Sequence, residues 1–239
     1  MKYTEITFET PEENLACDEV LLDLCEDGHS GEILRFWEPN QYFVVLGYSS
    51  KANQEVNLAA CKKNKIPVLR RSSGGGTVLQ GPGCLNFSLI LNTQNGRPLK
   101  NLVETNCYVM AHHQKALQPL INSPISVEGF TDLTLNRLKF SGNAQRRKKR
   151  FLLFHGSFLL KFDLEKIEQY LPIPKKQPNY RKNRTHKDFL TNLNLPAEKI
   201  KRALKKIWSA EERTRVMLKD HIDKLVKKRY DKQEWNFKF

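Results

Sequence analysis

Arg70-Arg71-Ser72-Ser73-Gly74-Gly75-Gly76-Thr77-Val78 places three consecutive glycines between paired arginines and a β-branched run. Glycine has no Cβ and adopts positive φ easily, so such a loop brings bare backbone amides close to a ligand. Arginine adds a permanently charged, planar group that suits a carboxylate or a phosphate. The segment therefore predicts a binding loop for a small anion.

The residues on either side of the loop predict buried strands. Pro67-Val68-Leu69 leads into the loop, and from Leu85 to Leu91 apolar residues alternate with Asn86 and Ser88. A glycine-rich hairpin turn with two solvated arginines is the plainer alternative. Two common phosphate-binding motifs are excluded, because no Gly-Lys-Ser/Thr follows the glycines and no helical pattern opens directly after them.

The rest of the chain shows strands first and helices later. Helices are expected over about 11–27, opened by a Thr10–Glu13 capping box, and over 56–63 and 102–120. Another helical region is expected over about 197–230, where Ile200, Leu204 and Ile207 share one face. Further strands are expected over 3–8, 33–37, 42–46, 125–128, 133–140 and 152–162. This order predicts an α+β fold, with a mixed, largely antiparallel β-sheet flanked by helices.

Length and composition fit one large domain or two small ones. We expect a single domain over residues 1–239, with a basic, mainly helical part from about residue 163. No apolar run is long enough to cross a membrane, and no signal pattern opens the chain, so we expect a cytoplasmic protein without a membrane partner. Five cysteines, an odd number without C-x-x-C spacing, argue against a disulfide framework and a structural zinc site.

Positive charge is concentrated in the second half of the chain. Residues 1–136 hold 11 Lys/Arg against 15 Asp/Glu, whereas residues 137–239 hold 29 against 11, a net charge of +18. This charge implies an anionic partner, and composition leaves open whether it is nucleic acid, an acidic membrane surface or an acidic protein. Two basic runs, 146–150 and 180–186, are expected to be loops near the anion site, with solvated surface charge as the alternative.

Several segments, in order along the chain, resemble the lipoate-protein ligase A family of the biotin and lipoyl ligase superfamily. They are the glycine segment, Lys139-Phe140-Ser141-Gly142-Asn143-Ala144, Phe154-His155-Gly156-Ser157, and Tyr230 to Asn236, which resembles the end of the family's main domain. The resemblance spans nearly the whole chain but omits the small accessory domain that follows in many members. It implies the class II synthetase-like catalytic-domain fold of these ligases.

The resemblance also implies an activity. Such enzymes use ATP and Mg²⁺ to convert lipoate or octanoate to an acyl-adenylate, and then transfer the acyl group to a lysine of an acceptor protein. The expected acceptors are acidic apo-lipoyl domains of 2-oxoacid dehydrogenases or the glycine-cleavage H protein. Some members receive the accessory domain as a separate subunit.

Two alternatives to ATP-dependent ligation stay open. Other members of the superfamily are ATP-independent acyltransferases. One branch of octanoyltransferases uses a cysteine three residues before the strand histidine, where this chain has Leu152. From another class, a non-catalytic module on the same scaffold would bind nucleic acid through its basic half, although we do not expect this partner.

Individual roles follow from the same resemblance. Lys139 would stabilise negative charge at the reacting carboxylate and α-phosphate, and Asp132 would orient Lys139 or assist Mg²⁺. Cys84 is either an acyl acceptor or, as we favour, a small residue that lines the acyl tunnel. The lipoate site would comprise Arg71, Ser73, Gly74, Gly75, Asn86 and His155. The ATP site would comprise Gly76, Thr77, Val78, Leu79, Lys139, Ser141, Gly142 and Ala144.

Overall fold

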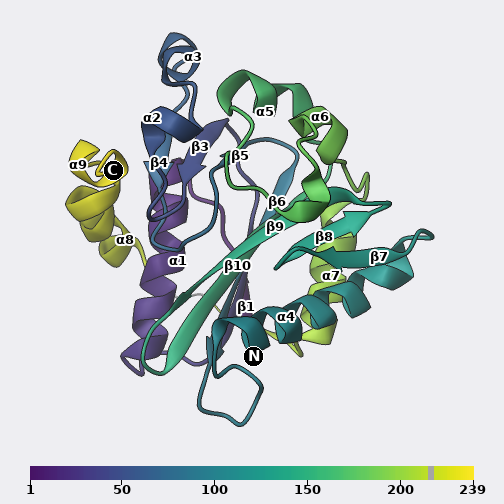
Figure 1. Ribbon diagram of the computed structural model, residues 1–239. Coiled ribbons are helices and arrows are strands. Elements are labelled where there is room, and N and C mark those ends of the chain that lie inside the picture. The colour runs from purple at the N-terminus through teal and green to yellow at the C-terminus, as the bar shows by residue number, and fades with distance from the viewer. Residues whose placement is uncertain (215–217) are drawn as a thin grey trace.

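Two β-sheets organise the computed structural model, which describes residues 1–214 and 218–239 (Figure 1). In the described residues sheet A has eight strands in the order β11-β1-β2-β6-β10-β9-β8-β7, and sheet B has three in the order β4-β3-β5. Strand β1 pairs in parallel with β2 and β11, and β3 with β4, whereas the other pairs are antiparallel. The predicted α+β fold with a mixed, largely antiparallel sheet is confirmed. The strands are β1 (Lys2–Glu5), β2 (Ile33–Trp37), β3 (Phe43–Leu46), β4 (Val68–Arg70), β5 (Val78–Gln80), β6 (Cys84–Asn92), β7 (Ile125–Glu128), β8 (Asp132–Leu135), β9 (Leu138–Arg147), β10 (Phe151–Leu159) and β11 (Glu212–Arg213).

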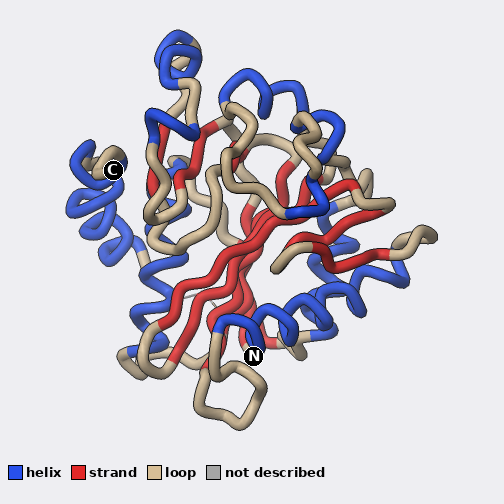
Figure 2. Tube along the Cα trace, viewed as in Figure 1, coloured by secondary structure: helices blue, strands red, loops and turns tan. Residues whose placement is uncertain are grey.

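Helices cover both faces of sheet A (Figure 2). Helix α1 and the C-terminal helices lie on one side, and α4 and α7 lie on the other. Short 3₁₀ turns span Gln118–Leu120 and Asn179–Arg181, and a π turn spans Val226–Tyr230. The α-helices are α1 (Pro11–Glu26), α2 (Ala52–Glu55), α3 (Leu58–Lys63), α4 (Leu102–Leu117), α5 (Leu164–Tyr170), α6 (His186–Phe189), α7 (Ala197–Ile207), α8 (Lys219–Leu225) and α9 (Gln233–Asn236).

Alternation along β6 divides the core between the two faces. Its apolar residues from Leu85 to Leu91, taken at every second position, pack with α4 and α7 in one cluster, as the sequence predicts. Ile200 and Leu204 of α7 are fully buried in the same cluster. Ile90 points the other way, into a cluster with α1 and α8. Sheet A is therefore covered on both faces.

Helix α1 begins as predicted and is buried on two sides. The Thr10 hydroxyl accepts a hydrogen bond from the Glu13 amide (3.3 Å), and the Glu13 carboxylate accepts one from the Thr10 amide (3.1 Å), which together form a capping box. The π turn packs against the side of α1 away from the sheet, where Tyr230 donates to Glu19 (2.9 Å). This double packing explains why α1 buries polar side chains as well as apolar ones.

The C-terminal segment from Tyr230 to Asn236 closes the free edge of sheet B. The side-chain oxygen of Asn236, Oδ1, accepts a hydrogen bond from the backbone amide of Arg70 (3.0 Å). The Trp235 indole donates one to the backbone carbonyl of Arg70 (2.8 Å). Strand β4 lies at the edge of its sheet, so these bonds satisfy backbone groups that no neighbouring strand reaches.

The loop connections differ from the sequence prediction in two places. The glycine loop joins β4 to β5 rather than to β6, and β4 and β5 both pair with β3, so the segment is not a hairpin. The predicted strand over 133–140 is two strands, because Asn136 and Arg137 both have positive φ and form a tight two-residue turn. Strand β9 therefore starts at Leu138 and carries Lys139 through Ala144.

Two helical predictions were also too simple. The segment 56–63 contains only α3, which Asn57 caps at its start, and α2 precedes it. The segment 197–230 is not one helical region, because β11 follows α7 before α8 begins; its residues 215–217 lie outside the described residues.

The basic run 146–150 is not a loop over Lys139. Arg146 and Arg147 belong to the far end of β9, and residues 148–150 form its turn into β10. Arg146 pairs with Glu19 (2.9 Å), Lys148 pairs with Asp23 (2.6 Å), and Arg150 bonds to Glu26. With a rise of about 3.3 Å per residue, this turn lies at the opposite end of the strand from Lys139. Its cations mainly fasten the hairpin to α1.

Candidate active site

Polar residues form two rows across the face of sheet A that meets α1. Strands β2, β6, β10 and β9 pair in register, so directly opposed residues share a face. Hydrophobic residues dominate the neighbouring positions, which makes the rows a polar strip inside a buried region. The first row is Arg35, Ser88, His155 and Ala144, and the second is Trp37, Asn86, Ser157 and Gly142.

The glycine loop crosses the first row. Ser73 Oγ lies 2.6 Å from Nε2 of His155, and a Cβ placed on Gly75 would lie 3.5 Å from the Ala144 methyl group. Gly75 has φ +87°, and the same Cβ would come within 2.9 Å of Nη2 of Arg71, so the position requires glycine. The three glycines are exposed, whereas Ser73 is buried beneath them.

Lys139 reaches the second row on the same face. A Cβ on Gly142 would lie 2.9 Å from the Lys139 Nζ atom, so the absence of a side chain at Gly142 makes room for the amine. Gly142 and Ala144 are two residues apart on one strand, about 6.5 Å. The amine and the glycine loop therefore lie side by side over β9.

Asp132 and Tyr180 hold the amine in place. Asp132 Oδ1 pairs with Lys139 Nζ (2.8 Å), and Asp132 Oδ2 accepts a hydrogen bond from the Tyr180 hydroxyl (2.7 Å). Burial, reinforced by the Asp132 carboxylate, raises the pKa of Tyr180 well above its ordinary value, so the hydroxyl stays protonated and donates. The Lys139 side chain is one quarter exposed, which leaves its amine accessible from solvent.

Arg71 is turned toward its own loop. Its Nη2 donates to the carbonyls of Gly74 (2.6 Å) and Gly76 (2.8 Å), and its Nε donates to Ser73 Oγ (3.0 Å). Burial lowers the pKa of Arg71 to about 10, partly offset by Glu55, so the guanidinium remains charged at neutral pH. The cation thus shapes the exposed glycine loop, and its predicted contact with lipoate stays a prediction.

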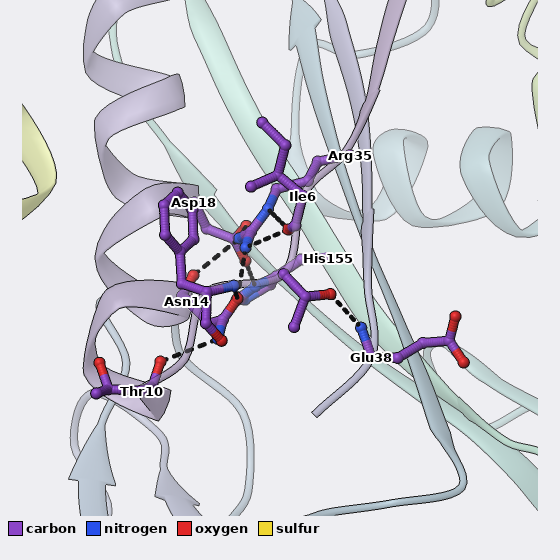
Figure 3. A network of polar contacts seen from close by, with 9 residues as sticks. Ile6, Thr10, Asn14, Asp18, Arg35, Glu38 and His155 are labelled. Carbon is purple, nitrogen blue, oxygen red and sulfur yellow. Dashed lines mark hydrogen bonds and ion pairs between the residues drawn. The ribbon is translucent and has the colours of Figure 1, made fainter. Parts of the chain in front are cut away.

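A buried ionic network supports His155 from below (Figure 3). Its Nδ1 lies 3.4 Å from Asp18 Oδ2, and Asp18 Oδ1 pairs with Arg35 Nη1 at 2.6 Å. Burial alone would raise the pKa of the Asp18 carboxyl, but the charge of Arg35 and the hydrogen bond from His155 outweigh burial and hold this pKa below its usual range. Neither Asp18 nor Arg35 was singled out from the sequence.

The other predicted positions are distributed around this centre. Asn86 is buried in the second row, and no described residue bonds to its Nδ2 atom. Thr77 donates to Glu55 (2.6 Å), and Val78 and Leu79 belong to β5, where Leu79 is buried. The Ser141 side chain lies on the opposite face, because its partners Leu133 and Phe158 pack in the α4 cluster. Only the Ser141 backbone is available to a ligand over β9.

The second basic run, 180–186, lies beside the amine. Thr191 donates to the Lys139 carbonyl (2.9 Å), which fixes the following segment along β9. Arg184 donates to the carbonyls of Arg137 and Tyr180 at 3.1 and 3.0 Å, so it fastens the segment internally. The run is placed near the predicted site, but these arginine donors serve the protein itself.

Cys84 is a packing residue in this structure. It is 1% exposed and lies in an apolar cluster with Val44 and Leu159. Burial raises the pKa of its thiol to about 12, so the reactive thiolate is absent at neutral pH. This argues against Cys84 as an acyl acceptor, and its predicted place along an acyl tunnel stays a prediction.

No helix among residues 1–214 and 218–239 combines the length and apolarity needed to cross a membrane.

Known proteins are similar to this chain in sequence and in fold. The family profile of the lipoyl protein ligase A/B catalytic domain matches residues 10–219. The chain is 29% identical to probable lipoate-protein ligase A of Mycoplasma pneumoniae, over 94% of this chain and 67% of that protein. It is 28% identical to the octanoyltransferase LipM of Geobacillus kaustophilus, over 95% and 94%.

Solved structures agree in fold at low sequence identity. The bipartite lipoate protein ligase of Thermoplasma acidophilum, studied with its E2 lipoyl domain, superposes with a TM-score of 0.81 at 22% identity and covers 99% of this chain and 96% of that one. A lipoate-protein ligase A bound with ATP gives a TM-score of 0.80 at 24% identity, covering 99% of both chains. Because the profile spans most of the sequence, this chain belongs to the lipoyl protein ligase A/B catalytic domain family.

Proposed function

We propose that this chain is a lipoate-protein ligase whose residues 1–239 act as one cytoplasmic catalytic domain. It activates lipoate or octanoate with ATP to an acyl-adenylate and transfers the acyl group to a lysine of an acceptor protein. The observation that carries the proposal is the meeting of the glycine loop and the Lys139 amine on one face of β9. A mixed anhydride of a carboxylate and a phosphate carries negative charge on its phosphate, next to its apolar acyl chain. An ammonium group beside an exposed glycine loop suits such a group.

The role of Lys139 follows from its surroundings. An ammonium group aimed at the reacting carboxylate and α-phosphate stabilises charge that grows during both half-reactions. Asp132 binds the lysine amine through one carboxylate oxygen, and Tyr180 holds the other oxygen of the same carboxylate. Together they limit the rotation of the long lysine side chain. The amine is thereby positioned before substrate binds.

The glycine loop would receive the rest of the anhydride. In this proposal, residues 76–79 contact the nucleotide, while Ser73, Gly74, Gly75, Asn86 and His155 border the acyl group. Arg71 supports the loop from behind through its bonds to the Gly74 and Gly76 carbonyls.

Mg²⁺ fits this site only together with the nucleotide. Asp132 is the one predicted carboxylate, and both of its oxygens already have partners in Lys139 and Tyr180. Magnesium commonly binds to one or two carboxylates plus substrate phosphates. Bound in this way, it would neutralise phosphate charge next to the ammonium of Lys139.

An ATP-independent acyltransferase is the second candidate, favoured by the similarity to LipM. A transferase of that kind needs a nucleophile. Leu152 stands where one branch carries cysteine, and it is fully buried on the α4 face. The Cys84 thiol is buried and protonated. These residues favour ligation through an adenylate over a cysteine relay.

We propose that the acceptor is an acidic apo-lipoyl domain or H protein. The C-terminal half of the chain carries the excess of positive charge, and complementary charge speeds the encounter of two proteins.

The deciding experiment incubates the purified chain with ATP, Mg²⁺, lipoate and an apo-lipoyl domain, and follows the acceptor mass. We expect a gain of one lipoyl group that requires ATP. Lipoate-dependent exchange of pyrophosphate into ATP reports adenylation separately. Modification from octanoylated donor protein without ATP would instead establish the transferase. Absence of modification under both conditions would refute both candidates.

A further inference from the structure

The network beneath the glycine loop is a continuous line of hydrogen bonds from a buried cation to the loop. It runs from Arg35 through Asp18 to His155 (Figure 3). From His155 it continues to Ser73 and ends at Arg71. Its four contacts measure 2.6, 3.4, 2.6 and 3.0 Å in that order. Both ends are guanidinium groups, which can only donate.

Donor and acceptor roles along this line are fixed from the Asp18 end. Arg35 is fully buried, and its other donors bond to the Ile6 carbonyl and to the backbone and side-chain carbonyls of Asn14, so it cannot turn away. The pKa of Asp18 is held low, so its carboxylate is ionised and accepts from both neighbours. Nδ1 of His155 must therefore carry a hydrogen.

The Ser73 end fits the same arrangement. Arg71 Nε donates to the Ser73 oxygen, and the hydroxyl has one hydrogen of its own to donate. Nε2 of His155 lies 2.6 Å from that oxygen and accepts this hydrogen when the ring is protonated on Nδ1 alone. The hydrogen on Nδ1 follows from Asp18, and the same tautomer satisfies the contact with Ser73.

We propose that Asp18 is a positioning residue, which fixes His155 as the Nδ1–H tautomer so that Ser73 and the glycine loop are held in one orientation. The tautomer concerns this chain alone. Its consequence for acyl transfer rests on the proposed function.

Asp18→Asn tests this, because Arg35 dictates how the amide must lie. A guanidinium accepts no hydrogen bond, so the amide oxygen faces Arg35 and the amide NH₂ faces His155. An NH₂ group opposite Nδ1 requires an unprotonated Nδ1, which moves the hydrogen to Nε2. The ring could then no longer accept the Ser73 hydroxyl hydrogen, so the hydroxyl must turn to another acceptor and the bond that orients the loop reverses its direction. In serine proteases the equivalent substitution of a buried aspartate also imposes the wrong tautomer.

The direct measurement is the ¹⁵N–¹H correlation of the histidine rings at pH 7.5 in ¹⁵N-histidine-labelled protein. His155→Gln identifies the His155 signals. We expect Nδ1–H in the wild type and Nε2–H in Asp18→Asn. Ser73→Ala removes the contact at Nε2 and should keep Nδ1–H; together with the wild type it carries the test if Asp18→Asn does not fold. A wild-type ring protonated on Nε2, or on both nitrogens, would overturn the proposal.

The kinetic measurement compares Asp18→Asn with Asp23→Asn, which changes an exposed carboxylate on the same helix that pairs with Lys148. A displaced loop should lower kcat of acyl transfer by roughly 10-fold to 100-fold, whereas Asp23→Asn should leave it unchanged. A tautomer switch with unchanged kcat would refute the positioning role while leaving the tautomer established. If the chain proves to have no acyl-transfer activity, the ring measurement still decides the tautomer.

Discussion

Each face of sheet A has a histidine packed against it, and the polar partners of the two rings differ. His155 is mostly buried, with its side chain 13% exposed, and His113 is fully buried. On the α1 face, His155 lies between an ionised aspartate and a serine of the glycine loop. On the α4 face, His113 packs edge-on against Phe87, with ring centroids 4.6 Å apart, and no described residue bonds to either nitrogen. One ring is held by polar partners, and the other is packed as an aromatic.

The difference shows how strand alternation separates chemistry from packing. Burial, with a smaller effect of the neighbouring His112, lowers the pKa of His113 to about 3, so this ring stays neutral and stabilises only through contact. The polar rows on the other face keep their orientation through Arg35 and Asp18. A face that must bind a charged ligand therefore depends on buried ion pairs, and a face that only packs does not.

The largest expected effect is on the ionic side of this comparison. Arg35→Met leaves the Asp18 carboxylate buried without its cation, which should lower the free energy of unfolding by about 3–5 kcal/mol at pH 7. Urea unfolding measures this. Arg97→Met is the matched control, because Arg97 pairs with Glu32 in a partly exposed position. This substitution should lower the free energy of unfolding by at most about 1 kcal/mol. Equal losses would mean that burial does not distinguish the two pairs.

The pH dependence of the same variant has a definite sign. The pKa of Asp18 is lowered from an ordinary value of 3.8, so its ionic stabilisation is complete above that value and is lost as the pH falls below it. The cost of Arg35→Met should therefore be largest near neutrality and shrink toward pH 3. A cost that grows on acidification would contradict the assignment of charge to Asp18.

Lys139→Ala tests the chemical side of the comparison. Loss of the ammonium should reduce both adenylation and transfer by about 10²–10³-fold, while the free energy of unfolding changes little because the side chain is one quarter exposed. Lys149→Ala, at the exposed turn between β9 and β10, should leave both rates unchanged. Unchanged acceptor modification by Lys139→Ala would show that the amine has no part in the reaction.

The sequence predicted the packing face better than the polar face. Alternation from Leu85 to Leu91 identified the buried face of β6, and the Thr10–Glu13 spacing identified the start of α1. The family resemblance assigned Lys139 and the glycine loop to the same ligand site, although they lie far apart in the sequence. The intervening strand β5 was missed, since only three residues form it and the pairing is with β3 rather than with a neighbour in sequence.

The missed site residues differ in how visible they were. Arg35 is the one charge in the apolar run Ile33 to Trp37. Asp18, next to Glu19, stands between the apolar stretches 15–17 and 20–22, and a buried charge requires a partner. This signal was available. Tyr180 gave no such signal, because its contact with Asp132 depends on how the segment after α5 folds back along β9.

His113→Phe tests the packing side. An unfolded histidine binds a proton below about pH 6.5, but the folded ring does so only near pH 3, so wild-type stability falls as the pH drops between these values. Phenylalanine removes this loss, and the stability difference in its favour should grow by about 2 kcal/mol between pH 7 and pH 5. Thermal or urea unfolding at both pH values measures it. A constant difference would mean that His113 is not buried as a neutral ring.

The smallest effect sharpens the comparison at the Lys139 amine. Tyr180→Phe removes one hydrogen bond from Asp132 but leaves the ion pair with Lys139 intact. A hydrogen bond worth about 1 kcal/mol that orients Asp132 corresponds to a roughly threefold to tenfold lower kcat when it is lost. KM for the acceptor should not change, because Tyr180 is buried behind the carboxylate. Tyr108→Phe, on the α4 face, is the control and should not alter kcat. If both variants slow the reaction equally, Tyr180 acts through general packing. Asp132 would then orient the Lys139 amine without the hydrogen bond from Tyr180.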